Sequence, residues 1–79
     1  MFYVYVLRNS TTNKRYIGYT SNLEERIRRH NTNHAGFTGQ AGEWHVIYYE
    51  EYTSKSSALK REKFLKSGKG REFLNNLTE

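Results

Sequence analysis

Cysteine, proline and aspartate are all absent from this chain of 79 residues. Without cysteine, neither a disulfide nor a thiolate zinc site can stabilise the fold. Without aspartate, all eight acidic side chains are glutamates, and these are scattered along the sequence. Because two-metal catalytic sites need several convergent carboxylates, the composition favours at most one metal ion with few protein ligands.

Long apolar runs are absent too. No stretch approaches the roughly 20 residues of a membrane span, and the N-terminus lacks the basic-then-apolar order of a signal peptide. We therefore expect a cytoplasmic protein with no membrane partner. The length predicts a single domain, residues 1–79, that buries only about 60% of the surface its unfolded chain exposes. Seven tyrosines, four phenylalanines and one tryptophan strengthen that small core.

Positive charge is in excess. Thirteen lysines and arginines against eight glutamates give a formal charge of +5 and a pI of about 9.6. Small basic domains often bind polyanions, although the same charge also serves solubility. The segment from Lys55 to Arg71 alone holds seven basic residues and one glutamate. This segment is either a track for a nucleic-acid backbone or a solvated helix face, and the pattern leaves both open.

The residue pattern predicts an α+β fold with a small three-stranded antiparallel sheet. Phe2–Leu7 is apolar at every position, which is typical of a central strand covered on both faces. Arg15–Thr20 follows a polar turn and closes an antiparallel hairpin. Trp44–Tyr52 is rich in β-forming residues and is the third strand. The Gly-rich segment 31–42 is expected to be a surface loop, without the Lys-Ser/Thr ending of a phosphate-binding loop.

Two longer helices and a short C-terminal helix are expected around this sheet. The first begins at Ser21, because Ser21-Asn22-Leu23-Glu24 fits a capping box. Its Leu23 and Ile27 are four residues apart and face the core. The second runs from a cap at Thr53 or Ser54 to about Lys66, with Gly68 as its C-cap. The third spans about 71–77 and docks through three apolar side chains, Phe73, Leu74 and Leu77.

Chemical groups gather in the hairpin and in the helix after it. Tyr16 is expected near Tyr5 across the hairpin, although strand tyrosines also pack simply as aromatic core. Gly18 is a bulge, a place of close backbone approach, or a simple strand-end glycine. Arg26 and His30 are four residues apart, so they share one helical stripe. Phenols and a guanidinium together are groups that can take a proton and hold a phosphate.

Glu62 lies within the apolar stripe of the second helix. Ala58, Glu62 and Leu65 fall at i, i+4 and i+7, with Leu59 beside them. An inward-facing carboxylate costs free energy unless something pairs with it. Three interpretations stay open: a basic side chain from another element pairs with Glu62, Glu62 lies at a boundary position and reaches water, or Glu62 is a metal ligand.

These stretches, taken in order, resemble the GIY-YIG nuclease family over nearly the whole chain. The matching residues are Tyr3-Val4-Tyr5, Tyr16-Ile17-Gly18-Tyr19-Thr20, Leu23, Arg26 and His30-Asn31. The stretch Ala58–Lys66 resembles the helix that supplies the metal-binding glutamate of that family. The likeness is greatest to small stand-alone bacterial members, often named after the nuclease module of the excision-repair endonuclease. Tyr3 stands where the name-giving glycine would be.

The resemblance implies a metal-dependent endonuclease that hydrolyses DNA, with a role in DNA repair. Tyr5 and Tyr16 would be active-site tyrosines, one of them the general base towards the attacking water. Arg26 would hold the scissile phosphate, whose two oxygens a guanidinium can bind together. Glu62 would hold a single divalent cation, Mg²⁺ or Mn²⁺. His30 falls where members carry a tyrosine or histidine that assists the base or the leaving group.

DNA contacts are expected from a wider set of side chains: Tyr19, Arg28, Arg29, Lys60, Lys63 and Asn75. Tyr19 occupies a position that is lysine in some members. Many members use an asparagine in the C-terminal segment, and the spacing does not choose between Asn75 and Asn76. Substrate choice would come from self-association or a protein partner. Two other classes stay open: a non-catalytic nucleic-acid-binding module on the same fold, and a protein-interaction module.

Overall fold

The computed structural model describes residues 1–32 and 44–78, with the backbone alone for residues 30–32 and 78. The elements along the chain are β1 (Phe2–Asn9), β2 (Arg15–Thr20), α1 (Leu23–Thr32), β3 (Trp44–Tyr52), α2 (Lys55–Leu65) and α3 (Gly68–Thr78). The predicted α+β fold is confirmed. Beyond Thr32, the expected loop 31–42 lies outside the described residues. Within the described ranges, no helix is both long and apolar enough to cross a membrane.

The sheet has the order β2-β1-β3, and β1 pairs antiparallel with both neighbours. The prediction that the first strand is central is therefore confirmed. Its residues Val4 to Leu7 are completely buried, which explains why the segment is apolar at every position. Both β2 and β3 are therefore edge strands.

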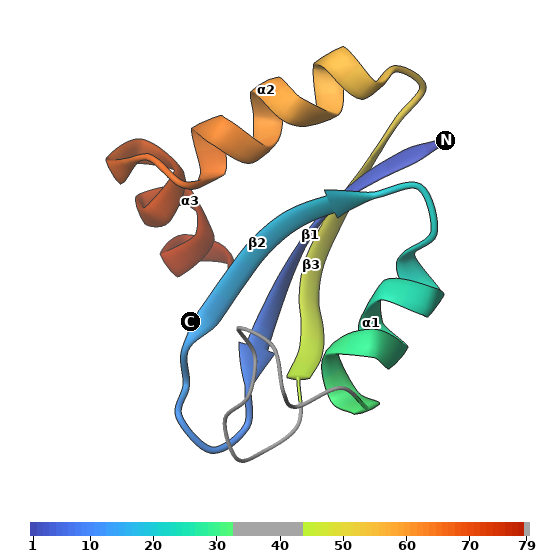
Figure 1. The fold of residues 1–79 in the computed structure, drawn as a ribbon. Helices are drawn as coiled ribbons and strands as arrows, with labels where there is room; N and C mark the ends of the chain where they lie inside the picture. The colour runs from blue at the N-terminus through green and yellow to red at the C-terminus, as the bar shows by residue number, and fades with distance from the viewer. Residues whose placement is uncertain (33–43, 79) are drawn as a thin grey trace.

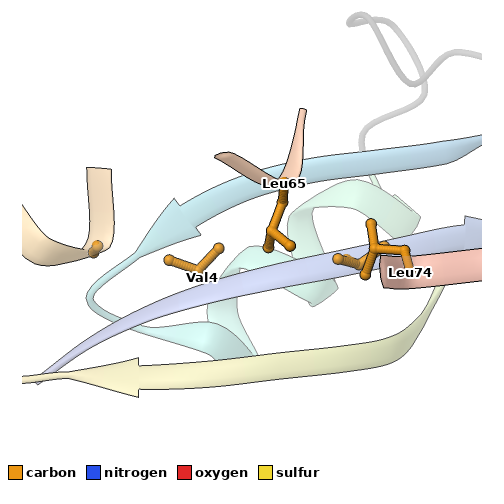
Figure 2. Close-up of a cluster of buried hydrophobic side chains, with 5 residues drawn as sticks. Val4, Leu65 and Leu74 are labelled. Carbon is orange, nitrogen blue, oxygen red and sulfur yellow. The ribbon is translucent and has the colours of Figure 1, made fainter. Parts of the chain in front are cut away.

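Helices cover the two faces of the sheet, with α1 on one side and α2 and α3 on the other (Figure 1). Side chains of β1 alternate between these faces. Val4 and Val6 belong to one buried cluster with Leu65 and Leu74. Figure 2 shows Val4, Leu65 and Leu74 of this cluster. Tyr5 and Leu7 face the opposite layer with Trp44, and the predicted core residues of α1, Leu23 and Ile27, pack against them.

The start of α1 differs by one residue from the prediction. Asn22, not Ser21, is the N-cap: its Oδ1 accepts a hydrogen bond from the Glu25 backbone N–H at 3.1 Å. The backbone N–H of Asn22 in turn donates to Thr20 Oγ1 at 3.1 Å. Both Ser and Asn are good caps, so the sequence pattern alone did not discriminate between them. The Thr20 contact, which depends on the end of β2, selects Asn22.

The C-terminal helix is longer than expected. It begins at Gly68, which was predicted to be the C-cap of the preceding helix, because Ser67 acts as its N-cap. The Ser67 carbonyl accepts from the Arg71 N–H at 2.9 Å, and its hydroxyl accepts from the Gly70 N–H at 3.3 Å. Leu77 was expected to dock in the core, but it is 50% exposed. The N-cap of the second helix, Ser54, is as predicted.

A polar network ties α2 to β3. Arg61 donates from Nε and Nη2 to the two carboxylate oxygens of Glu50, at 2.9 and 3.0 Å. The hydroxyls of Tyr48 and Tyr52 donate to the same carboxylate. The Arg61 guanidinium also lies 5.1 Å from the centre of the Phe73 ring of α3. This network therefore joins three elements around one negative charge.

The network makes stability depend on pH. Burial alone would raise the pKa of Glu50, but hydrogen bonds from Arg61, Tyr48 and Tyr52 outweigh it and hold that pKa below its ordinary value of 4.5. A lowered folded-state pKa stabilises the protein above pH 4.5, and the contribution is lost as pH falls through the folded value. We expect Glu50→Gln to lower the free energy of unfolding at neutral pH by about 1.5–3 kcal/mol.

Urea unfolding at neutral and at acidic pH measures this effect. The difference between wild type and Glu50→Gln should shrink on acidification, because the wild-type carboxylate then becomes protonated. Glu51→Gln is a matched control, since Glu51 is the exposed neighbour on the same strand. An equal loss in both variants, or a difference that does not change with pH, would contradict the role assigned to the network.

Candidate active site

Tyr5 of β1 and Tyr16 of β2 lie on the face of the sheet that α1 covers. Their ring centroids are 6.2 Å apart, with the rings tilted by 44°. Tyr5 is completely buried, whereas Tyr16 is half-buried. The expected approach of the two phenols across the hairpin is therefore confirmed.

Gly18 is what permits this approach. It pairs directly with Tyr5 in the antiparallel register. A Cβ atom at Gly18 would lie 2.8 Å from the Tyr5 hydroxyl and 3.1 Å from the Tyr16 ring, which is closer than carbon atoms pack. Of the three interpretations left open by the sequence, close approach is correct: the pairing with β1 has no register shift at Gly18, and the missing side chain provides the space that the phenol of Tyr5 occupies.

The environment of Tyr5 keeps its phenol protonated. Burial raises the pKa of Tyr5, and the neighbouring Tyr16 and Glu62 raise it further. Arg26 lowers it, but this single charge does not offset the other effects. A hydrogen bond between the two tyrosines acts in the same direction as burial. At neutral pH Tyr5 can therefore donate a proton in a hydrogen bond, but it is a poor proton acceptor.

Arg26 and Glu62 come from helices on opposite faces of the sheet, yet they line one cleft. The cleft has a volume of about 400 Å³ and is lined by Phe2, Tyr5, Tyr16, Gly18, Tyr19, Thr20, Ser21, Arg26, Lys55 and Glu62. Both faces of β2 contribute to it, which is possible because β2 is an edge strand. The carboxylate, the guanidinium and the two phenols expected to act together thus share a single open site.

Comparison with known proteins shows the family of this chain. A model of the GIY-YIG catalytic domain matches residues 1–76 of the chain. The chain belongs to the GIY-YIG family. Among its relatives, the UPF0213 protein of Oceanobacillus iheyensis is 39% identical over 61 residues, covering 76% of this chain and 70% of that protein. The UPF0213 protein of Staphylococcus haemolyticus is 35% identical over 78 residues, covering 98% and 94% of the two chains.

A solved structure is also similar to this chain. The solution NMR structure of a UPF0213 protein from Bacillus halodurans superposes with a TM-score of 0.59 at 28% sequence identity. The superposition covers 98% of this chain and 85% of the other. The likeness therefore extends over all the described elements of the GIY-YIG chain, including the helix that carries Glu62.

Glu62 is the candidate metal ligand of this GIY-YIG chain. Its side chain is 17% exposed and pairs with Lys66, one turn further along α2, at 3.2 Å. Glu62 therefore has a basic partner, as one alternative expected, but the prediction that this partner comes from another element is wrong: Lys66 is four residues further along the chain, at the end of the same helix. Lys66 is 55% exposed, so the pair contributes only about 0–1 kcal/mol, and a cation can replace the lysine.

The donor set at Glu62 fits magnesium. In the described part of the chain, no three His or Glu side chains form a group that could hold a metal. Mg²⁺ suits such a site, because it binds through one or two carboxylates and retains several waters or substrate phosphate oxygens. A structural zinc site would need four protein ligands. Glu62 thus fits a hard cation that the protein holds by one carboxylate.

Other sequence-predicted residues lie at different distances from the cleft. Tyr19 lines it, but Asn75 does not: its Oδ1 accepts from Arg15 Nη2 at 2.9 Å. Arg29 is exposed and pairs with Glu25 at 3.1 Å. Three further predicted contacts, Arg28, Lys60 and Lys63, are exposed on their helices and do not line the cleft. Of His30 the backbone alone is described, so its predicted role stays a prediction.

Lys55 is the cleft residue that the sequence analysis missed. It is the first residue of α2 and lines the cleft with Glu62. A signal was available, because Lys55 and Glu62 are seven residues apart and so share one face of a helix. Lys55 is one of seven basic residues in the segment from Lys55 to Arg71, and the sequence pattern did not show which of the seven faces the site.

Proposed function

We propose that this GIY-YIG protein is a metal-dependent endonuclease that hydrolyses phosphodiester bonds of DNA. The observation that supports the proposal is the shared cleft of Tyr5, Tyr16, Arg26 and Glu62. Phosphodiester hydrolysis needs a proton acceptor for the attacking water, cationic groups for the phosphate, and stabilisation of the leaving oxygen. The four side chains and Lys55 supply groups of the first two kinds within one site.

Arg26 and Lys55 are the phosphate-binding groups. The Arg26 guanidinium can donate to two phosphate oxygens at once, whereas Lys55 adds a point charge on the opposite wall of the cleft. Their fixed positive charge stabilises the additional negative charge that develops on the phosphate oxygens as water attacks. The same charges favour a negatively charged oxygen in the cleft, which assists a phenolate.

Tyr16 is the better candidate for the general base. Tyr5 is buried with a raised pKa, so it keeps its proton. The half-buried Tyr16 lines the cleft, and the Tyr5 hydroxyl can donate a hydrogen bond that stabilises negative charge on the Tyr16 oxygen. The water oxygen attacks phosphorus while its proton passes to the Tyr16 phenolate. The bond from phosphorus to the leaving sugar oxygen breaks, and that oxygen takes a proton from solvent.

Glu62 would hold the divalent cation. When bound, the cation supplies Lewis-acid stabilisation of the phosphate and of the leaving oxygen. Before it binds, Lys66 neutralises the Glu62 carboxylate at low energetic cost. The carboxylate lies beside Tyr5, whose pKa it raises, so Glu62 also helps to keep that phenol as a hydrogen-bond donor.

The two tyrosines give the test. We expect Tyr16→Phe to lower the rate of Mg²⁺-dependent cleavage of plasmid DNA by about 10²–10⁴, the usual contribution of a general base. Tyr5→Phe removes only a hydrogen bond to a charged oxygen, worth about 1.5 kcal/mol, so its rate should fall about tenfold. Initial rates of conversion from supercoiled to nicked and linear DNA measure both effects.

Each variant is the control for the other, because each loses one hydroxyl and retains its ring. Equal rates for wild type and Tyr16→Phe would refute Tyr16 as the base. A larger loss in Tyr5→Phe would transfer that role to Tyr5. If the wild type binds DNA but does not cut it with Mg²⁺ or Mn²⁺, the protein is a binding module on the same fold.

A further inference from the structure

A second cleft lies beside the catalytic one. It has a volume of about 420 Å³, and three cationic side chains line it: Arg15, Lys66 and Arg71. They come from the start of β2, the end of α2 and the first turns of α3. Its remaining lining residues are Tyr16, Ile17, Leu65 and Leu74. Neither the family comparison nor the proposed chemistry assigns a role to this cleft.

Positive charge in this cleft is balanced locally only in part, because Lys66 pairs with Glu62 at 3.2 Å. No carboxylate is among its described lining residues. Arg15 donates from Nη2 to Asn75, but its Nη1 is buried and has no hydrogen-bond partner within the described ranges. A buried guanidinium N–H without an acceptor is costly. An anion that enters the cleft would supply both the missing acceptor and the missing negative charge.

The two clefts adjoin at Tyr16 on β2. Both are lined by Tyr16: the catalytic cleft continues towards Ser21 and the second cleft towards Arg15. Three residues of a strand, from Arg15 to Gly18, span about 10 Å. One strand of duplex DNA rises about 3.4 Å per nucleotide along the duplex axis, and its winding backbone is longer, so this length corresponds to fewer than three nucleotides. The apolar side chains of Ile17 and Leu65 line the second cleft and can contact a deoxyribose ring of the bound strand.

We propose that the Arg15–Lys66–Arg71 cleft binds the sugar-phosphate backbone of the nucleic acid at a phosphate within about three nucleotides of the one that is cut. The inference rests on the proposed function in one respect: Tyr16 lines both clefts, so the position of the cut relative to the bound phosphate follows only if Tyr16 is at the catalytic site. Binding of the phosphate itself needs no catalysis. Asn75 then has a positioning role. It accepts a hydrogen bond from Arg15 at the start of β2 and does not contact the scissile bond.

Binding of a labelled DNA duplex, measured by fluorescence anisotropy with a chelator present, tests the proposal. Arg71→Ala should weaken binding and reduce the salt slope by about 0.9, so that its defect relative to wild type shrinks about 3.5-fold between about 50 and 200 mM salt. Lys69→Ala is the matched control: Lys69 carries the same charge on the same exposed first turn of α3 but does not line the cleft. Its binding should equal that of wild type.

Neutral methylphosphonate linkages, placed one at a time along the duplex, locate the contact. Neutralising the contacted phosphate should weaken binding of wild type more than that of Arg71→Ala, because both changes remove the Arg71 contact while Arg15 and Lys66 remain. Additive losses at every position, or equal salt slopes for Arg71→Ala and wild type, would overturn the subsite. A wild type that binds through Arg71 without ever cutting DNA would instead overturn the nuclease and leave the subsite standing.

Discussion

Replacing Glu62 by glutamine is expected to lower the rate of Mg²⁺-dependent DNA cleavage by about 10²–10⁴. Glutamine has the same shape, but its neutral amide is a weak ligand for a hard cation. A metal that stabilises transition-state charge is worth several kcal/mol, and about 1.4 kcal/mol corresponds to a tenfold change in rate. Initial rates of plasmid nicking over a range of Mg²⁺ concentrations provide the measurement.

The fold should survive this substitution. The Lys66 partner is more than half exposed, so losing the pair costs at most about 1 kcal/mol. Glu72→Gln is a suitable control, because Glu72 is exposed on α3 and lines neither cleft. Paramagnetic Mn²⁺ should broaden the NMR signals of Tyr16 and Gly18 in wild type and not in Glu62→Gln. Wild-type cleavage by a folded Glu62→Gln protein would refute its role as metal ligand.

Local patterns were sufficient to predict most of the fold. The uninterrupted apolar run of β1 indicated a central strand, because only a strand covered on both faces tolerates such a run in water. Glu62 could be singled out because a carboxylate within an apolar stripe is costly without a partner. The approach of Tyr16 to Tyr5 followed from hairpin pairing. In each case residues close in sequence, or paired across one turn, carried the information.

Features that depend on the meeting of distant segments could not be predicted in this way. Arg26 and Glu62 lie on helices that cover opposite faces of the sheet, and only the position of β2 at the edge allows them to share a cleft. The Arg15 contact that diverts Asn75 from this cleft joins residues sixty positions apart. Gly68 matched a helix C-cap by residue type, but the competing cap at Ser67 makes it the start of the next helix.

Arg26 is expected to produce the second large effect. Arg26→Ala should lower the cleavage rate by about 10²–10³, the usual cost of losing one donor that stabilises developing negative charge. Arg26→Lys should recover only part of this loss, because a lysine ammonium cannot bind two phosphate oxygens in a planar, forked geometry. Single-turnover cleavage at saturating protein separates the rate of the chemical step from the affinity for DNA.

The electrostatics of the cleft make this result interpretable. Arg26 lowers the pKa of Tyr5, so its removal raises a pKa that burial already holds above the ordinary value. The protonation state of Tyr5 at neutral pH therefore stays the same, and the loss of rate does not arise from Tyr5. Arg28→Ala is the control, since Arg28 is exposed on the same helix and does not line the cleft. Equal losses in Arg26→Ala and Arg28→Ala would indicate general attraction of DNA to α1 instead of a specific grip on the scissile phosphate.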